Sequence, residues 1–144
     1  MKFFRDWGPV IAWAGLIFLF STDLFSGAHT SRFLIPFLRW LFPGASAHTL
    51  HQIHFYVRKA GHITEYFVFS LLLFRGIRGG RAGWRITWAL AAVAVAACYA
   101  ALDEVHQAFV PSRGPSAFDV LLDTCGAAAA QVLAWLWPRR QSPE

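Results

Sequence analysis

Charged residues are scarce in this sequence: aspartate, glutamate, lysine and arginine together make up 15% of its 144 residues. Cysteine is scarcer still. Cys98 and Cys125 lie in apolar runs without the spacing of metal ligands, so we interpret both as small buried hydrophobic residues. The sequence also lacks any signature of a DNA- or RNA-binding module, despite a net charge of +5. We therefore expect no nucleic-acid partner.

Apolar residues are abundant instead. Hydrophobic residues account for 56% of the chain and aromatic residues for 17%, more than a soluble domain of this length readily buries. Four apolar runs have the length of membrane spans, at about residues 7–25, 59–74, 86–110 and 116–137. The sequence predicts an all-α fold in which residues 1–144 form one domain, an integral membrane four-helix bundle.

The first two runs are joined by a long connection, residues 26–57. Within it, residues 31–42 alternate arginine with aromatic and aliphatic residues. This stretch is too short and too charged to span a bilayer, so we predict an interfacial or re-entrant segment. Three histidines then recur at every third position, His48, His51 and His54. We interpret them as a water-exposed helix face beside the membrane rather than as a three-histidine metal site.

Basic residues lie mostly on one side of this predicted bundle. The first run resembles a signal peptide but lacks a small-x-small cleavage site, so we expect it to be retained. Eight basic residues fall at the two termini and in the loop between the second and third spans, against five on the other side. The positive-inside rule then places both termini in the cytoplasm, in the inner membrane. The eight are Lys2, Arg5, Arg75, Arg78, Arg81, Arg85, Arg139 and Arg140.

A polar site is predicted at the outer boundary of the bundle. Asp103 and Glu104 end an apolar run, where hydrocarbon does not solvate two carboxylates. Three spans carry ionisable groups to a similar depth on this side, which predicts one outward-facing cavity. The residues expected to line it are Lys59, His62, Glu65, Asp103, Glu104, Gln107, Arg113, Asp119 and Asp123.

Three motifs in this region resemble those of the VanZ-like family. They are Lys59-x-x-His62-x-x-Glu65-Tyr66, Asp103-Glu104-x-x-Gln107-x-Phe109-x-Pro111-x-Arg113 and Asp119-Val-x-x-Asp123-x-x-Gly126. The chain departs from the pattern at Asp123, where the family usually has asparagine, and at Arg58, where an acidic residue often stands. The resemblance implies a small multi-span membrane protein linked with the cell envelope and, for the founding member, low-level teicoplanin resistance.

Ligand binding is the first function that the predicted cavity permits. Lys59 and Arg113 hold the anionic headgroup of an envelope lipid or of a glycopeptide-related ligand, and Arg113 can donate two parallel hydrogen bonds to it. Gln107, Asp119 and Asp123 then contact the polar sugar or peptide part. Membrane lipids are the expected partners, and the sequence leaves any cofactor open.

Catalysis is the second function. In a hydrolase or transferase acting on an envelope lipid, His62 is the general base, oriented by Glu65 or Asp103, and Glu104 is the acid. The motifs contain no serine or cysteine nucleophile, so water or a substrate hydroxyl attacks. A metal-assisted version uses His62 with the same acids.

The third interpretation is purely structural. The same charges then form an ion-pair network that fixes how the helices pack, as charged residues within membrane helices often do. The expected pairs are Lys59 with Glu65 and Arg113 with Asp119. In this case the protein acts as a structural or interaction protein, without a ligand in the cavity.

Overall fold

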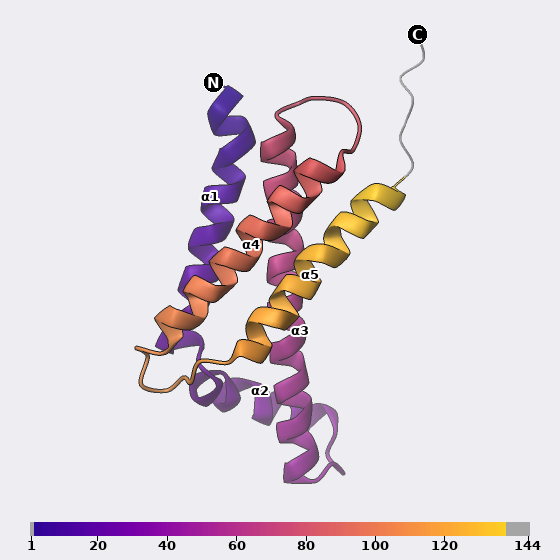
Figure 1. The fold of residues 1–144 in the computed structure, drawn as a ribbon. Coiled ribbons are helices and arrows are strands. Elements are labelled where there is room, and N and C mark those ends of the chain that lie inside the picture. The colour runs from indigo at the N-terminus through magenta and orange to yellow at the C-terminus, as the bar shows by residue number, and fades with distance from the viewer. Residues whose placement is uncertain (1, 138–144) are drawn as a thin grey trace.

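The computed structural model describes residues 2–137, which form five α-helices and one short 3-10 helix (Figure 1). No β-strand occurs among these residues, so the predicted all-α class is confirmed. The elements are α1 (Lys2–Ser21), η1 (Asp23–Phe25), α2 (Gly27–Leu41), α3 (Ala47–Arg78), α4 (Ile86–Gln107) and α5 (Ala117–Leu136).

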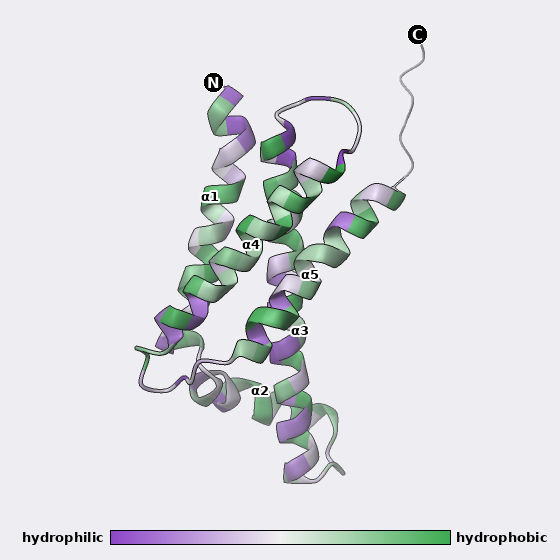
Figure 2. Ribbon diagram, viewed as in Figure 1, coloured by the Kyte–Doolittle hydropathy of each residue, from purple (hydrophilic) through white to green (hydrophobic). Residues whose placement is uncertain are grey.

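Three helices, α1, α4 and α5, are long and apolar enough to cross a membrane. They correspond to the predicted runs 7–25, 86–110 and 116–137, and their boundaries differ from the predicted ones by a few residues. The predicted second span, residues 59–74, lies inside α3. That helix is less apolar because polar residues such as His62 interrupt it, and Figure 2 shows hydrophilic residues concentrated in its lower half.

α3 is longer than its apolar run because both of its ends are capped. The Oγ of Ser46 accepts a hydrogen bond from the backbone N–H of Thr49 (3.1 Å), which stabilises the N-terminus. Gly79 ends the helix in the left-handed conformation, with φ at 59°. Residues 47–57, predicted as part of a connection, therefore extend α3 by about three turns beyond the expected span.

α2 lies crosswise at the lower end of the bundle in Figure 1 and packs against α3. Ser26 caps its N-terminus, and Leu38 is its buried residue. Its other side is apolar but exposed: Phe33, Phe37 and Trp40 expose 81%, 53% and 76% of their surfaces. The predicted interfacial or re-entrant segment is thus a regular helix with arginines among exposed aromatic side chains.

The bundle is organised around α3, which packs against α1, α4 and α5. α4 contributes Ala92, Ala96 and Ala100, which are completely buried. A Cβ atom added to Gly126 of α5 would lie only 2.6 Å from the backbone oxygen of Ile63 in α3. Gly126 therefore lets α5 approach the backbone of α3 closely.

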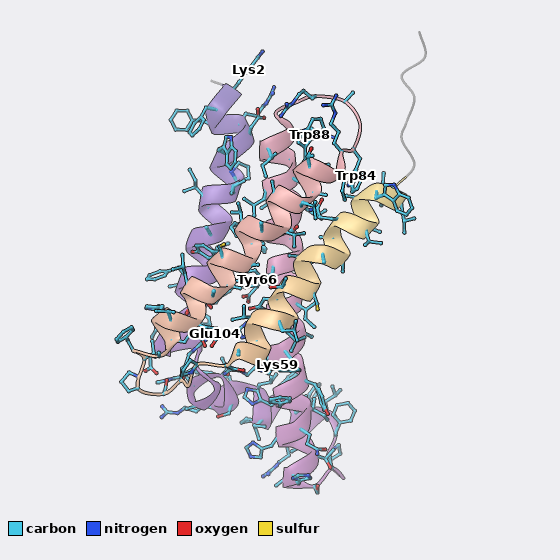
Figure 3. The ribbon with its side chains drawn as sticks, in the orientation of Figure 1. Lys2, Lys59, Tyr66, Trp84, Trp88 and Glu104 are labelled. Carbon is cyan, nitrogen blue, oxygen red and sulfur yellow. The ribbon has the colours of Figure 1, made fainter. Side chains whose placement is uncertain are left out.

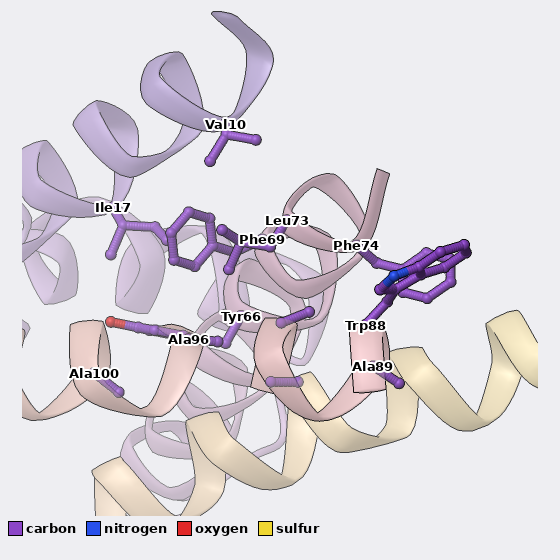
Figure 4. Close-up of a cluster of buried hydrophobic side chains, with 12 residues drawn as sticks. Val10, Ile17, Tyr66, Phe69, Leu73, Phe74, Trp88, Ala89, Ala96 and Ala100 are labelled. Carbon is purple, nitrogen blue, oxygen red and sulfur yellow. The ribbon is translucent and has the colours of Figure 1, made fainter. Parts of the chain in front are cut away.

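Aromatic rings pack in the same core cluster as Ala92, Ala96 and Ala100 of α4 (Figure 4). The Phe69 ring lies 5.2 Å from that of Tyr99, and the Phe74 ring 6.4 Å from that of Trp88. These rings belong to α3 and α4, so the contacts join the two helices along much of their length.

The prediction that both cysteines are buried is wrong. Cys98 and Cys125 are exposed on α4 and α5. In a membrane protein, the helix faces turned away from the core contact lipid chains, which are as apolar as the core itself. An apolar run therefore does not distinguish a core-facing cysteine from a lipid-facing one.

Candidate functional site

A cavity of about 280 Å³ lies between α1, α3 and α4, at the end of the bundle that α2 crosses. Its lining contains both polar and apolar residues, so the cavity suits a molecule with a charged part and an apolar part. Its ionisable lining residues, here called the polar wall, are Arg58, His62, Glu65, Asp103 and Arg113. The apolar wall includes Ile17, Phe20 and Phe25.

α3 supplies most of the polar wall. Arg58, His62 and Glu65 lie at i, i+4 and i+7, which places them on one face of the helix. Asp103 approaches from the last turns of α4. Of the nine predicted site residues, four thus reach the cavity surface: His62, Glu65, Asp103 and Arg113.

The other five predicted residues do not line the cavity. The Nε2 of Gln107 donates a hydrogen bond to Asp103 Oδ2 (2.8 Å) and fixes that carboxylate. Glu104 accepts a hydrogen bond from the backbone N–H of Ser116 (2.6 Å), which joins α4 to the start of α5. These contacts make Gln107 and Glu104 positioning residues. The five are Lys59, Glu104, Gln107, Asp119 and Asp123.

Lys59 is neutralised by an ion pair between its Nζ and Asp119 Oδ1, which joins α3 to α5. Its Nζ also lies 5.2 Å from the centre of the Phe55 ring. The two pairs expected for a structural network, Lys59 with Glu65 and Arg113 with Asp119, are not formed. They fail because α5 places Asp119 beside Lys59, which the order of residues along the chain does not reveal.

His62 faces a buried acid. The Nδ1 of His62 lies 3.6 Å from Oδ1 of Asp123, a side chain that is only 1% exposed. The carboxylate within ion-pair distance of His62 therefore belongs to Asp123 and not to Glu65 or Asp103, which the sequence suggested. Neither atom has a hydrogen-bond partner within residues 2–137, so each remains available to the other after a small movement.

Arg58 is the charged cavity residue that sequence analysis missed. Its Nη1 lies 3.5 Å from Thr30 Oγ1 and rests on Gly27, where an added Cβ would come within 2.8 Å of Nη1. The signal was its spacing of i, i+4 and i+7 with His62 and Glu65. That signal becomes readable only when α3 is known to begin well before residue 58.

Arg113 approaches the cavity from the loop between α4 and α5. Its Nη2 donates a hydrogen bond to the backbone oxygen of Phe20 (2.6 Å), at the end of α1. Burial lowers the pKa of the Arg113 guanidinium below its ordinary value, and the nearby charge of Arg58 lowers it further. A guanidinium still remains protonated, so two cations face the same cavity.

A sequence model of the VanZ/LLP1 family matches residues 7–138. The chain belongs to the VanZ/LLP1 family. The matched range contains the cavity and all nine predicted site residues. Neither the curated proteins nor the solved structures contain a match to the chain. Family membership and three membrane-capable helices together support a membrane protein.

In this VanZ/LLP1 protein, one of the three histidines at the start of α3 differs from the prediction. His48 and His51 are exposed, as expected of a water-exposed helix face, but His54 is 7% exposed and its Nε2 lies 3.1 Å from Thr30 Oγ1. α2 covers His54, which the sequence did not indicate. Across residues 2–137, no three histidine, cysteine, aspartate or glutamate side chains are grouped closely enough to hold a metal ion.

Proposed function

We propose that this VanZ/LLP1 protein binds the phosphate headgroup of an anionic cell-envelope lipid in its polar cavity. The observation that carries the proposal is a pair of half-buried guanidinium groups, Arg58 and Arg113, that line the cavity. Neither forms an ion pair with an acid in the part of the chain that the structure describes. Guanidinium groups bind phosphate through two parallel hydrogen bonds, and a bound anion would compensate their charge.

The contrast between two neighbouring cations supports this assignment. Lys59, predicted to hold the headgroup, is already paired with Asp119 and lies outside the cavity lining. Arg58, the preceding residue, lines the cavity and is unpaired within residues 2–137. Arg58 therefore takes the ligand-binding role in our proposal, and Lys59 becomes a structural residue.

The apolar wall supports a lipid rather than a free anion. Phe20 and Phe25 line the same cavity as the arginines, where they can contact the first part of an acyl or polyprenyl chain. α2 provides a suitable approach, because Phe33 and Trp40 expose apolar surface beside arginines, as helices at a membrane interface do. In the proposal, α2 lies in the plane of the outer interface.

The proposal includes a four-span topology. α1, residues 59–74 of α3, α4 and α5 cross the inner membrane, and both termini lie in the cytoplasm. Figure 1 shows the N-terminus and the loop 79–85 at the end of the bundle opposite α2. The cavity lies at the end that α2 crosses, and in the proposed topology this end faces outward. Two of the basic residues behind this orientation, Arg139 and Arg140, lie outside the described residues.

The acids of the cavity define the rest of the ligand. Glu65 and Asp103 offer acceptors for hydroxyl or ammonium groups beyond the phosphate. Such groups occur on a lipid-linked sugar or peptide, which makes a glycopeptide-related ligand and teicoplanin-type resistance part of the same proposal.

Catalysis is the second candidate function, and the pairing of His62 with Asp123 favours it. In this arrangement the imidazole takes a proton from water or from a substrate hydroxyl, and Asp123 stabilises the imidazolium that forms. Glu104 does not line the cavity, so Glu65 replaces it as the acid in this version. The reaction would then be hydrolysis of, or group transfer to or from, the bound envelope lipid.

The test uses purified protein in lipid nanodiscs, mixed with a whole envelope-lipid extract and followed by mass spectrometry. The wild type should retain an anionic lipid, and Arg58→Gln or Arg113→Gln should retain about tenfold less, the effect of one charge-assisted contact. Arg39→Gln, an exposed arginine on α2, is the matched control. Displacement of the lipid by inorganic phosphate alone would identify a free anion, rather than a headgroup, as the ligand.

The same experiment separates binding from catalysis. A new lipid product made by the wild type and absent with folded His62→Gln would establish the second candidate. Equal lipid retention by the wild type and both arginine variants would contradict the proposed binding site.

A further inference from the structure

We infer that a groove between α4 and α5, at the opposite end of the bundle, holds one acyl chain of an anionic phospholipid, with its phosphate on Arg81 and Arg85. The groove has a volume of about 280 Å³ and is almost entirely apolar. This inference rests on the proposed membrane topology but not on the ligand of the polar cavity.

The groove is built by regular spacing on two helices. α4 contributes Ile86, Ala89, Leu90 and Val93, and α5 contributes Ala128, Gln131, Val132 and Trp135, each set at i, i+3, i+4 and i+7. Both helices are long and apolar enough to span a membrane, so lipid chains are the molecules that surround the groove. A chain lying in it follows the direction of the two helices.

Trp84 gives the groove a polar group at its mouth. This residue precedes α4 and lines the groove, and Figure 3 shows it where the loop approaches the end of α5. Its indole N–H is buried and has no acceptor within residues 2–137. Tryptophan at a membrane interface commonly satisfies this N–H with polar groups of lipids, and the ester carbonyl of a phospholipid is such an acceptor.

Two cations, Arg81 and Arg85, belong to the same loop before α4 as Trp84. The guanidinium carbon of Arg81 is 4.6 Å from the centre of the Trp88 ring, and that of Arg85 is 5.1 Å from it. Neither arginine forms an ion pair with an acid among the described residues. Two guanidinium groups on one ring concentrate positive charge in the loop that carries Trp84, at the start of the apolar groove along α4. An anionic phospholipid complements both features.

The test is photo-cross-linking in phosphatidylcholine nanodiscs. A phosphatidylglycerol probe with a photoreactive group on its acyl chain should label residues 84–93 and 128–135 more than the lipid-facing side of α1. Ala128→Phe places a ring in the groove and should lower this labelling about tenfold, the effect of a few methylene groups left unburied. Ala129→Phe, on the exposed surface one residue further, is the matched control and should leave labelling unchanged.

A second variant keeps the test decisive if Ala128→Phe does not fold. Val132 is 54% exposed at the rim, so Val132→Trp fills the same groove with less disturbance of the core. The headgroup part is tested by Arg81→Gln with Arg85→Gln, which should reduce phosphatidylglycerol labelling to the level of a phosphatidylcholine probe. The control pair is Arg32→Gln with Arg39→Gln on α2, which makes the same change in net charge.

Three results would overturn the inference. Uniform labelling of every exposed helix face would indicate ordinary surrounding lipid. Equal labelling by the phosphatidylglycerol and phosphatidylcholine probes would remove the role of the arginines. Cross-links between two protein chains at Val132 would show that a second copy occupies the groove. Arg58→Gln serves to keep the two proposals apart. It should lower retention in the polar cavity about tenfold while leaving labelling of the groove unchanged.

Discussion

The two ends of the bundle use the same helix faces for opposite purposes. Along α4, the buried residues Ala92, Ala96 and Ala100 lead directly to the buried residues Asp103 and Glu104. At one end this stripe packs against other helices, and at the other end it carries carboxylates. The same face of α4 therefore contributes to both the core and the candidate site. Alanines on this face pack in the core, and acids on it belong to the site.

The other two central helices change at a similar level. α5 buries Asp119 and Asp123 in its first turns and then Gly126 and Ala127. In α3 the boundary lies at Tyr66, which is completely buried and appears midway along the bundle in Figure 3. The apolar end holds the helices at fixed spacing, and this fixed spacing keeps the charged side chains of three helices close together. The predictions below test the two ends separately.

The largest effect is expected at the boundary between the two ends, at Gly126. Gly126→Ala forces a methyl group to within 2.6 Å of the Ile63 backbone oxygen, so α5 has to move away from α3. We expect the free energy of unfolding to fall by about 2–3 kcal/mol, although alanine favours helix by about 1 kcal/mol. Unfolding in a detergent titration measures the change.

Gly15→Ala is the control for this substitution. Gly15 lies within α1 and has no atom within 4 Å of an added Cβ, so alanine there should stabilise the helix slightly. Equal effects of the two substitutions would show that the close approach of α3 and α5 is unimportant. A loss confined to Gly126→Ala would show that the close approach of α3 and α5 stabilises the bundle.

The second prediction concerns the charged end and its two adjacent cations. Asp119→Asn removes the partner of Lys59 and should lower the free energy of unfolding by about 2 kcal/mol, because a partly buried ammonium group is left unpaired. Arg58→Gln should change it by less than about 1 kcal/mol, because Arg58 has no acidic partner within residues 2–137.

A double-mutant cycle with Lys59→Gln and Asp119→Asn isolates this interaction. We expect the two substitutions to be strongly non-additive, with a coupling free energy of about 1–2 kcal/mol. Additive effects would mean that the ion pair contributes nothing measurable. A loss from Arg58→Gln as large as that from Asp119→Asn would remove the distinction between the ligand-binding and the structural cation.

Much of the fold followed from the sequence, because apolar length is a strong signal in a membrane protein. The all-α class and three of the four expected spans correspond to helices of the structure. The full extent of α3 was hidden because Lys59, His62 and Glu65 lower its mean hydropathy, while its true start is set by the cap at Ser46. Hydropathy reports the environment of a segment, and capping decides where the helix begins.

The candidate site was predicted less completely, because hydrophobic periodicity loses its meaning inside a bilayer. Both the core-facing and the lipid-facing sides of a span are apolar, so the sequence did not reveal the rotation of each helix. That rotation decides that Asp119 meets Lys59, that Asp123 meets His62, and that Cys98 is exposed. Motifs indicated which residues gather, but the pairs among them depend on three-dimensional packing.

The smallest effect is expected outside the bundle, where α2 covers the start of α3. Burial lowers the pKa of His54 below its ordinary value of about 6.5, and the charges of Arg58 and His51 lower it further. The unfolded chain then binds a proton more readily than the folded one. The contribution of His54 is therefore complete above about pH 6.5 and is lost as the pH falls through the lowered pKa.

The contact between α2 and α3 should therefore loosen at acidic pH while the bundle core does not. Hydrogen exchange at Leu38 and Leu50, both buried near this junction, should accelerate between pH 7 and pH 5 after correction for intrinsic rates. His54→Gln keeps a side-chain hydrogen-bond donor toward Thr30 and cannot titrate, so its exchange should show no such dependence. If the variant and the wild type respond alike, another group controls the junction. If Ala96 in the core responds with Leu38, α2 is part of the same cooperative unit as the bundle.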